Sequence, residues 1–110
     1  MALSRIHAAT LLLTIAASSG VASAEATSPA AQRGLNFVRI HCAQCHATDK
    51  VSPSALRDAP PFRTLHLKYP VDNLQEAFAE GIVTGHPSMP QFQLDPGQVN
   101  DIITFFKTLE

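Results

Sequence analysis

Apolar positions recur with helical spacing in four segments of this chain, and no segment alternates polar and apolar residues as a strand does. The last segment begins at Asp95-Pro96, and Gln98 stands three residues after the expected cap. Its apolar positions follow one helical face: Val99, Ile102, Ile103, Phe106 and Leu109. The pattern predicts an amphipathic helix with that face in the core.

The first segment opens on Ser28-Pro29, where Ser28 is the expected N-cap and Pro29 suits the first helical position. The helix is predicted to run to about Cys42. Its apolar side is expected to hold Leu35, Val38 and Cys42, with Phe37 and Ile40 beside them. Gly34 lies in the middle, at a cost of ~1 kcal/mol relative to Ala. Such a glycine predicts the close approach of another helix.

Two shorter helices are predicted between these. Residues 48–61 are polar and carry prolines without a period, which is typical of a loop. Residues 61–69 are expected to form a short helix that ends at Pro70, with three residues on its apolar face: Phe62, Leu65 and Tyr69.

The third helix is expected to begin at Asp72, with Gln75 completing a capping box, and to stop at Gly81. Its buried face is expected to comprise Leu74, Ala77 and Phe78. Residues 82–94 have no period and are predicted to be irregular.

The first 24 residues have the composition of a secretory signal peptide. Arg5 precedes an uncharged apolar run at residues 8–17, and Ala22-Ser23-Ala24 is a small-residue cleavage site. The run is about half of the ~20 residues that span a bilayer. We therefore expect residues 1–24 to be removed and residues 25–110 to form a periplasmic domain without stable membrane insertion. An uncleaved anchor stays open as the alternative.

The expected mature chain is small and slightly acidic. It has seven Lys/Arg and nine Asp/Glu, which does not indicate binding to nucleic acid or to an anionic membrane. A partner with a positively charged docking patch would suit this overall charge. A single domain of this size is marginally stable on its own, so we expect it to be poorly folded without a cofactor in its core.

The two cysteines of the chain stand in Cys42-Ala43-Gln44-Cys45-His46. This string is the attachment sequence for a c-type haem, in which each thiol forms a thioether bond and the histidine binds the iron. Positions i and i+3 share one face of a helical turn, so both sulfurs can reach one porphyrin edge. A thioredoxin-type pair, half of a zinc site and a disulfide are the alternatives. The sequence has no βαβ pattern for the first and no second pair of close-spaced ligands for the second, and a disulfide would leave His46 without a role. Export from the cytoplasm agrees with haem attachment.

Met89 is the candidate for the second iron ligand. It is the only methionine after the signal peptide and lies between Pro87 and Pro90 in a segment without helical period. The prolines restrict the backbone on either side, which suits a ligand better than a core gap-filler. Three histidines are possible competitors for the iron: His86, His66 and His41. Binding of His46 and Met89 together would fill both axial positions and raise the potential relative to two histidines.

In the order of these features the chain resembles the small class I cytochromes c of bacteria. The shared order is a helix containing Gly34, the string from Cys42 to His46, short helices and loops, Met89-Pro90, and a C-terminal helix. The resemblance covers residues 30–109. It implies an all-α fold of about four helices around one covalently attached haem c, with Cys42 and Cys45 linked to the porphyrin and His46 and Met89 on the iron.

The resemblance also implies contacts around the haem. Gly34 and Phe105 would meet where the terminal helices cross. A proline carbonyl would accept the ring N–H of His46, and Pro53 is the first candidate, followed by Pro60. Contacts to the haem propionates would come from Arg63, His66 and Tyr69.

The chain departs from the family at the aromatic residue often found four positions before the first cysteine. Val38 holds that position, and Phe37 lies one residue earlier. A helix-contact role for Phe37 therefore does not carry over from the family.

These features predict an exported, monomeric electron carrier that passes single electrons between larger redox proteins, such as a dehydrogenase, an oxidase or a respiratory complex. Such partners usually meet through small, weak interfaces. Two other haem functions stay open: an enzyme or gas-binding protein with a labile Met89, including a peroxidase-like one, and a haem subunit of a membrane respiratory complex. A dithiol or zinc protein without haem is the third alternative.

Overall fold

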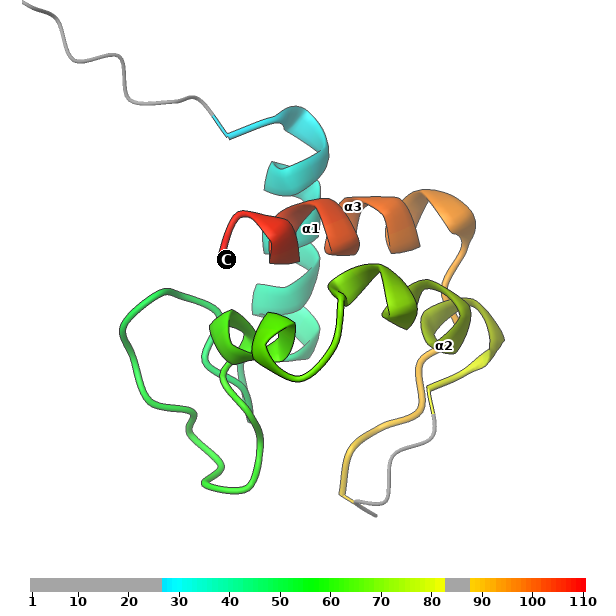
Figure 1. The fold of residues 1–110 in the computed structure, drawn as a ribbon. Helices are drawn as coiled ribbons and strands as arrows, with labels where there is room; N and C mark the ends of the chain where they lie inside the picture. Colours follow the sequence, from blue (N-terminus) through cyan, green and yellow to red (C-terminus); the bar gives the residue numbers. More distant parts are fainter. Residues whose placement is uncertain (1–26, 83–87) are drawn as a thin grey trace, which may run out of the picture.

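The computed structural model describes residues 27–82 and 88–110, and these form an all-helical domain without a strand (Figure 1). In chain order the elements are α1 (Pro29–His41), the 3-10 helices η1 (Phe62–Leu67) and η2 (Val71–Asn73), α2 (Leu74–Glu80) and α3 (Pro96–Lys107). The predicted all-α fold with about four helices is confirmed. The predicted signal peptide at residues 1–24 lies outside the described residues. No helix in the described ranges is long and apolar enough to cross a membrane.

Both terminal helices begin where the sequence predicts. The Ser28 hydroxyl accepts a hydrogen bond from the Ala31 amide at 3.2 Å. At α3, the Asp95 carboxylate accepts from the Gln98 amide at 2.9 Å, and the Gln98 side chain accepts from the Asp95 amide at 3.2 Å. The capping box predicted for α3 is therefore confirmed.

The predicted capping box of α2 is wrong. The 3-10 turn η2 runs directly into α2, so the residue before the helix, Asn73, already has a helical backbone and makes no side-chain cap. Asp72 instead accepts hydrogen bonds from the Gln75 side chain at 3.1 Å and from Lys107 at 2.8 Å. The predicted end of α2 is confirmed, because Gly81 has a φ of 106°, which few other residues adopt.

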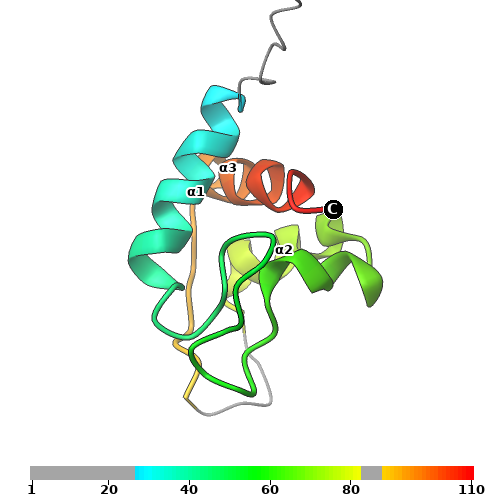
Figure 2. The ribbon, with the colours of Figure 1, turned by 90° about the vertical axis from the view of Figure 1, so that its left-hand side faces the viewer.

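The two terminal helices cross in contact (Figures 1 and 2). A Cβ atom built on Gly34 would lie 2.9 Å from the Phe105 Cβ and would collide with the Asp101 carbonyl. The Arg33 guanidinium adds two hydrogen bonds to the Asp101 carboxylate, each 2.7 Å long. The predicted close approach of a helix at Gly34 is therefore confirmed, and its partner is α3.

The core lies between these helices and the middle segments. The expected apolar face of α3 is buried in full, and Phe105 is buried beside it. Val38 of α1 is 1% exposed, whereas Ile40 is 75% exposed. The prediction that Ile40 belongs to the apolar side is wrong, because two residues along a helix correspond to about 200° of rotation. The wider core comprises Ala31, Val38, Phe62, Leu65, Val71, Phe78, Val99, Ile102, Ile103, Phe105, Phe106 and Leu109.

Candidate functional site

A cavity of about 360 Å³ opens below the C-terminal end of α1. Its size is within the range of small-molecule and cofactor sites. Its walls come from the end of α1, the following loop, η1 and Tyr69 after it, α2, residues 88–94 and α3. Most of the lining is apolar and includes Phe37, Val38, Leu56, Phe62, Leu65, Leu74, Phe78, Ile82, Phe92, Leu94 and Ile102. Cys42, Cys45, His46 and Met89 also line this cavity.

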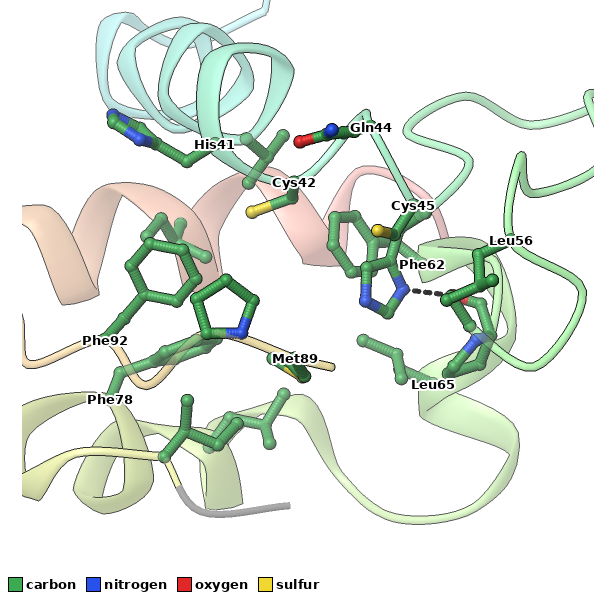
Figure 3. A pocket seen from close by; sticks show the side chains of 18 of the residues that line it. His41, Cys42, Gln44, Cys45, Leu56, Phe62, Leu65, Phe78, Met89 and Phe92 are labelled. Atoms are coloured by element: carbon green, nitrogen blue, oxygen red, sulfur yellow. Dashed lines mark hydrogen bonds between the residues drawn. The ribbon is translucent and has the colours of Figure 1, made fainter. Parts of the chain in front are cut away.

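The turn that follows α1 brings the two cysteines to one side of the cavity. The amides of Cys45 and His46 both donate to the Cys42 carbonyl, at 3.1 and 2.9 Å, so the chain continues in a tight turn. Figure 3 shows both sulfur atoms on the cavity side. Both are free thiols and half-buried. Burial, and secondarily the charge of Cys45, raises the pKa of the Cys42 thiol to about 11.

His46 is held by a hydrogen bond and by a ring contact. Its Nδ1 lies 2.8 Å from the Pro60 carbonyl oxygen (dashed in Figure 3). Because a carbonyl only accepts, Nδ1 carries the proton, and a neutral ring keeps the lone pair of Nε2 for a metal. The ring also stacks on Phe62, with centroids 4.6 Å apart and planes 20° apart.

The first candidate for this carbonyl, Pro53, is wrong, and the second candidate, Pro60, provides it. The Leu56 amide donates to the Cys45 carbonyl at 3.0 Å, and the Phe62 amide donates to Ala47 at 3.1 Å. These bonds fold the loop back on the cysteine turn, so that its last residues reach His46. Pro53 lies in the exposed outer part of the loop.

Met89 is brought to this cavity from the other half of the chain. It is half-buried, and Figure 3 shows it across the cavity from Cys42 and Cys45. Among the competing histidines, His41 lines the cavity and His66 does not. His86 lies outside the described residues.

Residues 29–106 match the family described as "Cytochrome C oxidase, cbb3-type, subunit III". This match covers both cysteines, His46 and Met89. The chain belongs to this family of monohaem cytochromes c. A cytochrome c-552 of Bradyrhizobium diazoefficiens is 28% identical over 104 residues, which cover 94% of this chain and 96% of the relative. A search of the solved structures gives no match.

The cavity of this cytochrome fits a haem c. Both cysteine thiols belong to its lining, and the rest of the lining is mostly apolar, as a porphyrin requires. A histidine with a free Nε2 and a thioether sulfur are the donors that c-type haem iron takes. Family membership implies the covalent haem, and these residues match its requirements.

The cytochrome uses the three residues considered for propionate contacts in different ways. Arg63 donates a hydrogen bond to the Ser52 carbonyl at 2.6 Å, and so ties η1 to the preceding loop. Neither Arg63 nor His66 lines the cavity, whereas Tyr69 does. The sequence did not reveal the loop contact of Arg63, because it depends on how residues 49–63 fold back.

Proposed function

We propose that this protein is an exported monohaem cytochrome c that carries single electrons between larger redox proteins. In this proposal Cys42 and Cys45 hold the haem covalently, and His46 and Met89 bind the iron. One observation carries the proposal: these four residues, from both halves of the chain, line the same apolar cavity.

The haem, when bound, supplies a metal centre that gains or loses one electron. The protein's own residues hold and insulate that centre. The Pro60 carbonyl orients His46, as ring N–H acceptors do for metal-binding histidines. The apolar walls keep water away and so favour the less charged iron. Two protein ligands leave little room for oxygen or peroxide, which favours a carrier over a haem enzyme.

We propose the cellular compartment of the protein from the features of residues 1–24. Residues 1–24 have the features of a cleaved signal peptide, and haem attachment to two cysteines suits a compartment in which free thiols would oxidise. We therefore place the mature domain in the periplasm.

The charges of the chain support an acidic partner. From Arg33 to Lys68 there are six Lys/Arg and two Asp/Glu, whereas residues 69–110 have one lysine and six carboxylates. Three exposed cations, Arg39, Lys50 and Arg57, lie close in sequence to the haem-attachment turn. The loop carrying two of them lies beside the end of α1 in both ribbon views. The overall negative charge favours a basic partner. The distribution of charge instead favours a partner whose acidic surface docks against the haem-attachment side of this protein.

A second candidate is a haem subunit of a membrane oxidase. The description of the matched family favours it. Stable co-purification of the native protein with one oxidase or dehydrogenase would support a subunit over a freely diffusing carrier.

The visible and near-infrared spectrum of the oxidised native protein tests the proposal. We expect a low-spin c-type spectrum with the iron–thioether charge-transfer band, and haem that stays with the protein after acid extraction. Met89→Ala should remove the band and lower the potential, whereas Met89→His should keep six ligands and still lower it. A high-spin native spectrum, or carbon monoxide binding without denaturant, would support the enzyme or gas-binding alternative. An unchanged Met89→Ala spectrum would mean that another residue, such as His86, is the ligand.

A further inference from the structure

Phe37 packs at the edge of the core and lines the cavity. Val38, one position later, is 1% exposed and packs in the core. The half-buried Phe37 ring lies instead at the cavity, 4.4 Å from the His41 ring and 6.4 Å from the Phe92 ring, measured between centroids. With the aromatic residue one position earlier than in the family, the Phe37 ring reaches the segment that carries Met89.

Phe37, His41 and Phe92 form an aromatic cluster between α1 and this segment. The planes of Phe37 and Phe92 are 72° apart, and those of His41 and Phe92 are 71° apart at a centroid distance of 6.2 Å. Both are edge-to-face arrangements, which aromatic rings favour. Figure 3 shows His41 and Phe92 on one side of the cavity, with Met89 farther in.

The other attachment of the segment is to α2. The Ile82 amide donates to the Phe92 carbonyl at 3.1 Å, and the Leu94 amide donates to the Phe78 carbonyl at 2.8 Å. Backbone bonds thus tie residues 92–94 to α2 and to Ile82 just after it, while the aromatic cluster ties Phe92 to α1. Met89 lies three residues before this doubly held point, and Pro90 between them restricts the backbone.

We propose that Phe37 is a positioning residue for Met89 and acts through Phe92. This inference rests on the proposed function, in which Met89 binds the iron. Phe37 holds the end of the Met89 segment against α1, so that the sulfur stays on the cavity side facing His46. Loss of one aromatic pair of this kind changes an equilibrium roughly two- to tenfold. Phe37 therefore governs how readily an external ligand replaces Met89, without contacting the iron itself.

The test uses the haem-loaded mature protein and imidazole as a competitor for the Met89 position. We expect Phe37→Leu to bind imidazole ~2–10-fold more tightly than the native protein. Its thioether band should also disappear at a correspondingly lower imidazole concentration. Phe37→Tyr keeps the ring and should stay within about twofold of native. Ile40→Ala is the matched control on the same helix, because Ile40 is 75% exposed and does not line the cavity.

Phe92→Leu tests the same contact from its other side, and remains informative if Phe37→Leu does not load haem. In a double-mutant cycle, the effects of Phe37→Leu and Phe92→Leu on imidazole affinity should be less than additive. An imidazole affinity of Phe37→Leu within about twofold of native, with an unchanged band, would refute the positioning role alone. A native protein without the thioether band would refute Met89 ligation, the part of the proposed function on which this inference rests.

Discussion

The Nδ1 atom of His46 lies 2.8 Å from the carbonyl oxygen of Pro60, which stands fourteen residues later in the chain. In a neutral ring this bond places the proton on Nδ1, and it fixes the orientation of the ring. The proline ring fixes one backbone angle at the carbonyl's own residue. The orientation of a candidate iron ligand therefore depends on a loop that carries no iron ligand.

Replacement of Pro60 should change the haem potential, whereas replacement of Pro53 should not. Pro60→Gly frees the backbone at the acceptor and weakens its hold on His46. Pro53→Gly makes the same chemical change in the exposed outer loop. Each variant should lose ~1 kcal/mol of unfolding free energy, because glycine gives the unfolded chain more freedom. Voltammetry should show a shift only in Pro60→Gly; equal shifts in both variants would contradict the role of this hydrogen bond.

Addition of one methyl group at Gly34 should destabilise the fold. The new Cβ would lie 2.9 Å from the Phe105 Cβ and collide with the Asp101 carbonyl. We expect Gly34→Ala to lower the unfolding free energy by ~1–3 kcal/mol, despite the better helix propensity of alanine. Gly97→Ala in α3 is the control, since its Cβ would meet only a side-chain oxygen, at 3.1 Å. Denaturant unfolding of the oxidised protein measures both; a Gly34→Ala protein as stable as the control would exclude close packing at this crossing.

The ion pair between α1 and α3 should make stability sensitive to acid. The Arg33 guanidinium hydrogen-bonds the Asp101 carboxylate and lowers the pKa of that carboxyl from its usual value. A carboxyl with a lower pKa in the folded state stabilises the fold above its unfolded pKa of ~3.9. That stabilisation is lost as the pH falls through the folded value.

Asp101→Asn should therefore reduce the slope of unfolding free energy against pH below about pH 5. Asp58→Asn is the matched control, because Asp58 makes no ion pair or hydrogen bond with any of the described residues. Chemical unfolding at several pH values distinguishes the two. Identical slopes in Asp101→Asn and the native protein would show that the pair does not contribute.

The chain without haem should not fold cooperatively. Core side chains such as Phe62 and Phe78 line the cavity of about 360 Å³. An empty cavity costs roughly 24 cal/mol per Å³ of its volume, which is severe in so small a domain. The Cys42→Ala/Cys45→Ala variant, freed of haem, should show a broad thermal transition by circular dichroism. A sharp transition would show that the helices alone suffice.

Electron transfer should be faster with anionic than with cationic reagents. The exposed cations Arg39, Lys50 and Arg57 lie close in sequence to the haem-attachment turn, and local charge attracts opposite charge at low salt. Ferricyanide should therefore react faster as ionic strength falls, and a hexaammineruthenium ion should show the opposite trend. The Lys50→Glu/Arg57→Glu variant should weaken both trends, and Glu76→Lys, a charge change on α2, should not. The opposite salt dependence in the native protein would favour a basic partner.

Much of the fold could be predicted because its signals are local. The cap at Ser28, the capping box at Asp95 and Gln98, and the stop at Gly81 depend on residues within one turn of each other. Asp72 shows the limit of such reasoning. Its sequence pattern matches a capping box, but the preceding 3-10 turn and Lys107 of α3 change its partners.

The sequence by itself determined the attachment string from Cys42 to His46, the helical class of the fold and Met89 as a candidate ligand. Each of these depends on residue type and short spacing, which local geometry translates directly into structure. Only the tertiary structure decided that Pro60 and not Pro53 holds His46, and that Phe37 faces the Met89 segment. Those relationships join residues 14 and 55 positions apart, and their distances depend on how loops and helices pack against one another.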